Sequence, residues 1–331
     1  MTTALLLFLV SVTAVVIAGT VLTRAADLIA ERTGLGRVWI GVILVATATS
    51  LPELATDISA VRLGAPNLGA GDLFGSSMAN MLILALLGLV PPRDLVFQRA
   101  ALDHALSASL AIILTALAAA LILAPTGLAV LGMGPESLIL LAVFVAGTLT
   151  VYRQGRRTPA APGGAASRTP QGPSLKSAVI RFGIAAVVVV AVSPVFAYSA
   201  ERIAELTGLG QTFIGTLLVG LSTSLPELVT AFAAARIGAF DLAVGNLFGS
   251  NAFNMVVFLP MELAHRGGPL FLLLDPSHAL TAFFAIVLMA LGLAAIMYRA
   301  ERRHALVEPG SVLMVICYLL ALWALYDHAR R

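Results

Sequence analysis

The amino-acid sequence predicts an all-α polytopic membrane protein with ten transmembrane helices, built as two inverted repeats of five helices. Three observations carry this prediction. Hydrophobic residues make up 59% of the 331-residue chain and charged residues only 11%, whereas soluble globular proteins carry about 25% charged residues. Ten apolar segments are each long enough to cross a bilayer. The two halves of the chain also repeat one another in sequence.

Each apolar segment approaches the length of about 20 residues that a spanning helix needs. Between the fifth and sixth segments lies a stretch rich in proline, glycine, serine and arginine, a composition typical of a flexible linker. We therefore predict a first repeat at residues 1–152, a linker at 153–176 and a second repeat at 177–331. The predicted spans are residues 3–23, 38–61, 68–90, 102–123, 128–151, 177–199, 212–235, 242–263, 279–298 and 305–326.

The first apolar segment is too long for the core of a signal peptide and lacks a basic leader, so we expect it to remain as a helix. The internal repeat is sharpest between residues 33–80 and 207–254, where 26 of 48 positions are identical at a constant offset of 174 residues. Apolar bias alone would not match Pro, Glu, Asn and Gly in register, so the halves arose by duplication. The repeated motifs are Thr-Gly-Leu-Gly (33–36 and 207–210), Thr-Ser-Leu-Pro-Glu-Leu (49–54 and 223–228) and Gly-Ser-x-x-x-Asn (75–80 and 249–254).

An odd number of spans in each half turns the second half upside down in the membrane. Inverted repeats of this kind place a substrate site near the bilayer midplane. With the N-terminus outside, 15 of the 20 Lys and Arg residues fall in inside loops and five fall outside, as the positive-inside rule requires. We expect a monomer in the plasma (inner) membrane, with both termini outside and the linker in the cytoplasm.

Composition also excludes several functions. The sequence has no basic face interleaved with aromatic residues, so nucleic acid is not an expected partner. The single cysteine, Cys317, excludes disulfide frameworks and thiolate metal clusters. The five histidines fall at span ends or in loops, away from the membrane-embedded acids. We therefore expect neither an enzyme nor a bound cofactor.

Two glutamates, Glu53 and Glu227, lie near the middle of the second and seventh predicted spans. A charged side chain at the bilayer centre costs about 2.5–3.5 kcal/mol on insertion scales, and such residues usually mark ion or proton pathways. Inverted repeats can bring the two carboxylates together, and a cation between them would offset the cost. The alternative is a protonated, hydrogen-bonded structural glutamate in each repeat.

A proline precedes each glutamate, at Pro52 and Pro226. A proline inside a helix has no N–H to donate to the carbonyl four residues back, and within lipid such a carbonyl needs another partner. A hard cation such as calcium accepts carbonyl oxygens readily. The alternative is a plain proline kink, which is common in membrane helices.

Hydroxyl and amide side chains recur one turn apart on the third and eighth spans. Ser76 and Asn80 have the repeat partners Ser250 and Asn254, and each pair offers oxygen atoms on one helix face. The alternative role is helix–helix packing, because the glycines around residues 71–75 and 245–249 give a pattern of small residues.

These motifs resemble the two alpha-repeats of the cation/calcium antiporter superfamily, which includes the sodium/calcium exchangers. The resemblance implies that Glu53 and Glu227 hold calcium together with the carbonyls of Thr49 and Thr223. It also implies that the first and sixth spans slide past a fixed core during exchange. A large cytoplasmic regulatory domain is not expected, because the linker has only about two dozen residues.

The resemblance further implies two flanking sodium sites. One would pair Ser76 with the carbonyl of Ala46, and the other would pair Ser250 with the carbonyl of Gly220. The remaining polar residues expected to line the same cavity are Ser50, Ser224, Asn80 and Asn254.

Three positions depart from the family pattern or from the internal repeat. Many sodium/calcium exchangers have an acid where this chain has Asn254. Asp72 and Asp57 have the uncharged repeat partners Asn246 and Ala231. We predict that the two aspartates form an acidic vestibule on the outer access path, which would concentrate cations. For Asp72 a helix N-cap is the alternative.

We therefore predict a secondary antiporter that exchanges calcium for sodium by alternating access. Sodium is favoured over protons because hydroxyl and carbonyl oxygens suit a hard cation, whereas a proton needs only a carboxylate. A proton-coupled calcium or cation antiporter stays open as the alternative. A passive channel is a weaker alternative, because channel filters are usually built by symmetric subunits.

Overall fold

The structure is a computed structural model that describes residues 1–33, 49–89, 103–129, 132–155, 174–236, 240–298 and 309–330. Eight helices in this part of the chain are long and apolar enough to cross a membrane. They confirm the predicted all-α class and match eight of the ten predicted spans. These helices are α1 (Thr2–Thr33), α4 (Pro66–Leu89), α6 (Asp103–Leu123), α7 (Pro135–Gly155), α8 (Leu175–Thr207), α12 (Phe240–Ala264), α13 (His278–Tyr298) and α14 (Pro309–Ala329).

The seventh predicted span is a broken helix. It is made of α9 (Gly210–Ile214), the π-helical turn η1 (Gly215–Val219), α10 (Gly220–Thr223) and α11 (Leu225–Arg236). The segment bends by 41° between Thr223 and Leu225, and counting it as one span gives nine candidates. Of the second predicted span, the structure describes its latter part, with α3 at Leu51–Arg62. The described residues therefore do not establish the count of ten.

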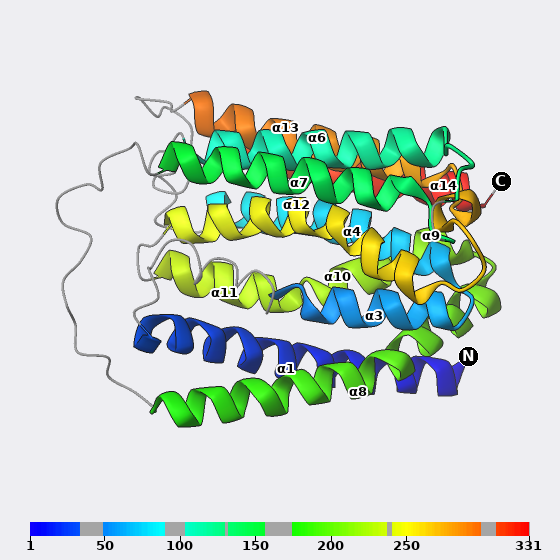
Figure 1. Cartoon of the computed structure of the whole chain (residues 1–331), viewed down its shortest axis with the longest axis horizontal. Helices are drawn as coiled ribbons and strands as arrows, with labels where there is room; N and C mark the ends of the chain where they lie inside the picture. The colour runs from blue at the N-terminus through cyan, green and yellow to red at the C-terminus, as the bar shows by residue number, and fades with distance from the viewer. Residues whose placement is uncertain are drawn as a thin grey trace.

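The long helices lie side by side as a bundle, with both chain termini at the same end (Figure 1). Helices α1 and α8 run antiparallel along one side of the bundle, while α6, α7 and α13 lie on the opposite side. The rings of Phe8 in α1 and Phe196 in α8 stack with centroids 5.2 Å apart. Helices α4 and α12 lie between these two layers, so they form the interior of the bundle.

The interior and the exterior are both apolar, as expected for a chain whose solvent is lipid. Phe74 of α4 packs on Phe258 of α12 with ring centroids 5.9 Å apart, and both side chains are fully buried. By contrast, α8 and α14 present large apolar side chains outward. Exposed contiguous apolar surface of this kind marks contact with a membrane. The outward residues include Val179, Ile184, Val187, Val190, Leu313, Leu319, Leu320 and Trp323.

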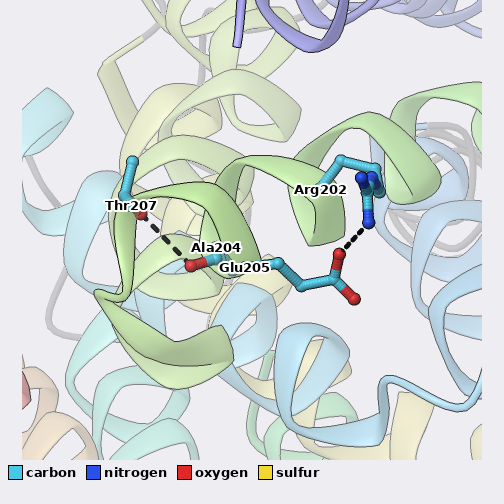
Figure 2. Close-up of polar contacts among 4 residues, drawn as sticks. All are labelled: Arg202, Ala204, Glu205 and Thr207. Carbon is cyan, nitrogen blue, oxygen red and sulfur yellow. Dashed lines mark hydrogen bonds and ion pairs between the residues drawn. The ribbon is translucent and has the colours of Figure 1, made fainter.

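Helix α8 ends in a charged, exposed turn. The Arg202 guanidinium donates to the Glu205 carboxylate, and the Thr207 hydroxyl donates to the Ala204 carbonyl at 3.3 Å (Figure 2). Gly208, with φ of 67°, then ends the helix, because a left-handed residue after the last turn favours glycine. The charged pair lies where an apolar helix would leave the hydrocarbon.

Candidate cation site

The two glutamates occupy equivalent places at the start of two half-helices. Ser50 and Ser224 have non-helical backbone angles (φ −90°, ψ 7° and φ −82°, ψ 2°), and α3 and α11 begin at the next residue. Each half-helix then starts Leu-Pro-Glu, because proline is tolerated in the first turn, where its missing N–H has no intrahelical acceptor. Glu53 and Glu227 thus lie in first turns, where the helix dipole favours negative charge.

These two half-helices start in the middle of the bundle. In Figure 1, α3 runs from the middle toward the end that carries the chain termini, and α11 runs toward the opposite end. Both glutamate side chains are buried, at 1% exposure for Glu53 and 0% for Glu227. The two carboxyl groups interact electrostatically, and the side chain of Thr49 interacts with Glu227. The structure therefore brings the two predicted ligands together at the centre.

A second set of oxygen atoms surrounds Ser76. Its hydroxyl donates to Asp72 Oδ1 at 2.9 Å, and lies 3.2 Å from Thr223 Oγ1 and 3.4 Å from the Gly220 carbonyl oxygen. Thr223 Oγ1 also donates to Asp72 Oδ1 at 2.8 Å. The hydroxyl that contacts the Gly220 carbonyl is therefore that of Ser76, and the expected pairing of Ser250 with Gly220 stays a prediction. Ala46, the other expected partner of Ser76, lies outside the described residues.

Two glycines, Gly75 and Gly220, let helix α4 approach the π-turn and α10 closely enough for the contacts of Ser76 to form. A Cβ added at Gly75 would lie 2.3 Å from the carbonyl oxygen of Thr216, and one added at Gly220 would lie 2.7 Å from the backbone of Gly75. The backbone of α4 therefore touches the π-turn and α10 directly. The predicted packing role of the glycines is confirmed at Gly75, and π-turns of this kind are common at functional sites.

Asn80 is oriented by a residue that the sequence analysis missed. Asn80 Nδ2 donates to Asn251 Oδ1 at 2.8 Å, and Asn251 Nδ2 donates to the Ser77 carbonyl at 3.2 Å. Because Asn251 uses its amide N–H on Ser77, its oxygen accepts from Asn80. Asn80 Oδ1 is buried and receives no hydrogen bond from the residues that the structure describes. The repeat could have revealed this residue, since Asn251 and Ser77 are themselves repeat partners.

Other predicted residues are buried in the same region without polar contacts. Within the described ranges, no hydrogen bond reaches the side-chain oxygens of Ser50, Ser224 and Ser250 or the amide of Asn254. Buried polar atoms are normally paired. Buried oxygen atoms without a hydrogen-bond donor are available as ligands to a dehydrated cation.

The two aspartates join this interior rather than an open surface. Asp57 and Asp72 are both fully buried, and their side chains lie within hydrogen-bonding reach of each other. Helix α4 begins at Pro66, so Asp72 lies beyond its first turn and the N-cap alternative is wrong. An outer vestibule at these residues stays a prediction, because neither carboxylate is exposed in this structure.

The four buried acids Glu53, Asp57, Asp72 and Glu227 interact electrostatically with one another. Across the described part of the chain, no group of three or more His, Cys, Asp or Glu side chains is arranged to hold a metal ion. A bound cation would therefore rely on hydroxyl, amide and carbonyl oxygens as well as carboxylates. Such mixed oxygen sets are what hard cations accept.

Paired half-helices that start with buried acids at the centre of an apolar bundle define a membrane ion-transport protein. A model of the family described as sodium/calcium exchanger protein matches residues 3–153 and 177–326. The chain therefore belongs to the sodium/calcium exchanger protein family, as its motifs predicted, and is an integral membrane antiporter of the cation/calcium class.

Known proteins agree with this assignment. The inner membrane protein YrbG of Escherichia coli (strain K12) is 28% identical over 256 residues, which cover 76% of this chain and 77% of YrbG. The sodium-calcium exchanger NCX_Mj has a TM-score of 0.60 at 20% identity, covering 97% of this chain and 98% of that chain. The H+/Ca2+ exchanger CAX has a TM-score of 0.63 at 14% identity, covering 99% and 88%. The two solved structures share the fold of this chain.

Proposed function

We propose that this chain exchanges calcium for sodium across a membrane by alternating access, with Glu53 and Glu227 as paired calcium ligands. The observation that carries the proposal is the burial of both glutamates at the starts of two half-helices that run to opposite ends of the bundle. Two carboxylates balance the charge of one calcium ion or two sodium ions. The proposed ligand set also includes the carbonyls of Thr49 and Thr223.

The proposed architecture is ten spans in two inverted five-helix repeats, joined by a cytoplasmic linker, with both termini outside the plasma (inner) membrane. Opposite chain directions of α1 and α8, and of α3 and α11, support the inversion. Both termini lie at one end of the bundle, which agrees with an even number of spans. The chain is proposed to act as a monomer.

The proposed moving part is the pair α1 and α8. Helix α1 contacts the first turns of α3 and α11, since a Cβ added at Gly19 would lie 2.7 Å from Pro226 Cγ and 3.3 Å from Pro52 Cγ. A sliding α1 would therefore pass directly over Pro52 and Pro226. Displacement of α1 and α8 along the core would open the glutamates to one side of the membrane at a time, as alternating access requires.

Sodium is proposed as the counter-ion because of the oxygen atoms around Ser76. A hydroxyl that lies near the Gly220 carbonyl and the Thr223 hydroxyl offers ligands to a hard cation. Protons are the second candidate, because a buried carboxyl can carry a proton without any further ligand. Because this chain shares its fold with the H+/Ca2+ exchanger CAX, the experiment also tests protons as the counter-ion.

The test is calcium movement in proteoliposomes that hold the purified full chain, with a sodium gradient or a proton gradient imposed separately. The proposal expects calcium efflux to follow the sodium gradient and to stop without it. Equal calcium efflux with sodium absent and a proton gradient present would mean that protons, and not sodium, are the counter-ion. Calcium movement without any counter-ion gradient would instead favour a channel.

A further inference from the structure

A cavity of about 350 Å³ lies between the ends of two helices, α3 and α12. Helix α3 ends at Arg62 and α12 ends at Ala264, both at the end of the bundle that carries the chain termini (Figure 1). The volume of this cavity is in the range of small-molecule sites, about 300–1,000 Å³. The described residues that line the cavity are Val61, Arg62, Leu263, Ala264, His265 and Arg266.

The lining of this cavity is basic. None of its described residues is acidic. Arg62 and Arg266 are both exposed, and neither forms an ion pair with a described residue. In the same part of the chain the imidazole of His265 makes no hydrogen bond, and its Nε2 is buried. Two unpaired guanidinium groups around one cavity attract an anion and repel a cation.

The carboxylate of Glu262, one turn before Arg266, does not neutralise this charge. Its side chain is only 1% exposed, so it does not reach the cavity. Glu262 Oε1 instead accepts hydrogen bonds from the backbone N–H groups of Gly134 and Leu270, at 2.8 and 3.1 Å. The positive charge of the lining is therefore available to a ligand.

The cavity also lies where two helices leave the hydrocarbon. Helix α12 is apolar enough to cross a membrane as far as Ala264. Leu263 lines the cavity and is 62% exposed, and Leu63, beside Arg62, is 42% exposed. A ligand in the cavity would thus contact guanidinium groups and outward apolar surface together. An anionic phospholipid has this chemistry, because its phosphate suits the planar donors of arginine and its acyl chains suit the leucines.

We propose that Arg62 and Arg266, with His265 beside them, bind the phosphate group of an anionic phospholipid, whose acyl chain lies along Leu263. Basic pockets between transmembrane helices bind anionic head groups in this way. Lipid is favoured over free phosphate because the rim of the cavity is apolar. This inference does not depend on which ions the chain exchanges.

A bound lipid would join the ends of two helices that already pack on α4. A Cβ added at Gly69 would lie 2.9 Å from Met261 Cε of α12 and 3.3 Å from Asp57 Cα of α3. Arg62 and Arg266 lie beyond this contact, so a phosphate between them would bridge α3 and the loop after α12. The alternative role of Arg62, a basic residue in the last turn of α3, is to stabilise the helix dipole without any lipid.

The test is native mass spectrometry and thermal unfolding of the purified full-length protein in a nonionic detergent, titrated separately with phosphatidylglycerol, phosphatidylcholine and inorganic phosphate. The wild-type chain is expected to retain one phosphatidylglycerol, with an affinity about tenfold or more above that for phosphatidylcholine, whose choline offsets the phosphate charge. The double variant Arg62→Gln, Arg266→Gln is expected to bind both lipids at the level of phosphatidylcholine.

Arg202→Gln is the matched control, because Arg202 is an exposed arginine at the same end of the bundle but is paired with Glu205 (Figure 2). It should bind phosphatidylglycerol as the wild type does. A wild-type unfolding temperature in phosphatidylcholine shows that the double variant is folded. Should that variant not fold, Arg266→Gln alone changes a residue outside both helices and should still lower phosphatidylglycerol affinity by about threefold or more.

Several results would overturn the proposal. Equal binding of the two lipids by the wild-type chain would do so without any variant, and so would unchanged phosphatidylglycerol binding in the folded double variant or an equal loss in Arg202→Gln. Displacement of phosphatidylglycerol by excess inorganic phosphate would assign the cavity to free phosphate, whereas no displacement supports the lipid. An equal loss of stability of the double variant in both lipids would assign the arginines to the helix ends alone.

Discussion

Replacing Gly75 with alanine should separate α4 from the π-turn and weaken the contacts of Ser76. The added Cβ would lie 2.3 Å from the Thr216 carbonyl oxygen, 2.6 Å from its Cα and 2.8 Å from its carbonyl carbon. All three atoms belong to the backbone, so no side-chain rotation relieves the clash. Ordinary contact begins near 3.4 Å, and the helices must therefore move apart by about 1 Å in a closely packed interior.

That displacement is large relative to the hydrogen bonds that depend on it. Ser76 Oγ lies 3.2 Å from Thr223 Oγ1 and 3.4 Å from the Gly220 carbonyl, so moving α4 by about 1 Å breaks both contacts. Overpacking of this kind typically costs about 1–3 kcal/mol of stability. We expect Gly75→Ala to lower the unfolding temperature and to lose most sodium-driven calcium exchange.

The assays are thermal unfolding in detergent and sodium-driven calcium uptake in proteoliposomes. Gly183→Ala is the matched control, because Gly183 lies inside α8 and no described atom lies within 4 Å of an added Cβ. That control should retain wild-type stability and uptake. Wild-type stability and exchange in Gly75→Ala would refute the close contact between α4 and the π-turn.

Four further substitutions test other parts of the protein. Asn251→Ala should weaken calcium binding by about tenfold, or about 1.4 kcal/mol, because Asn80 loses the acceptor that orients its amide. Calcium titration measures this change, and an unchanged affinity would exclude a positioning role for Asn251. Ser76→Ala and Ser250→Ala should each reduce the sodium dependence of exchange while calcium binding stays largely intact. An equal loss of sodium dependence and of calcium affinity would mean that the hydroxyls bind calcium. Glu262→Ala should destabilise the fold by about 1–3 kcal/mol, because Glu262 Oε1 accepts hydrogen bonds from two buried backbone N–H groups at 2.8 and 3.1 Å. An unchanged unfolding temperature would contradict this expectation.

Sequence patterns predicted most of the fold because lipid imposes a simple rule on length and hydrophobicity. Helices α6 and α13 (Asp103–Leu123 and His278–Tyr298) agree with their predicted ranges to within a residue or so. Helix α8 was predicted to end at residue 199 but continues to Thr207. Hydropathy marks where lipid ends, whereas a helix continues into water until a residue such as Gly208 ends it.

Two features were missed for a physical reason. The predicted fifth span begins at residue 128, but α7 begins at Pro135, because Gly127 and Gly132 have positive φ angles of 68° and 81° that interrupt the helix. The π-turn at Gly215–Val219 was also not predicted. Its cause is tertiary, since it packs against the glycines of α4, and hydrophobic periodicity carries no information about that contact.

For the candidate site, the repeat predicted the residue types better than their partners. It identified Glu53 and Glu227, which the structure places together at the centre. It assigned Asp57 and Asp72 to an outer path; the structure buries both, and the hydroxyls of Ser76 and Thr223 donate to Asp72. Which oxygen faces which depends on how closely α3, α4 and α10 pack, and spacing along the chain does not determine that distance.

The central claim is that Glu53 and Glu227 bind the transported calcium, and equilibrium binding of radiolabelled calcium to the purified chain tests it most directly. Calcium selectivity depends on the number of charged ligands, so Glu53→Gln and Glu227→Gln, each removing one of two carboxylates, should each weaken calcium binding by roughly a hundredfold or more, about 2.7 kcal/mol. Both variants should keep the wild-type unfolding temperature in calcium-free buffer or exceed it, since a buried uncompensated charge is removed. Calcium affinity near wild type in both folded variants would contradict the claim.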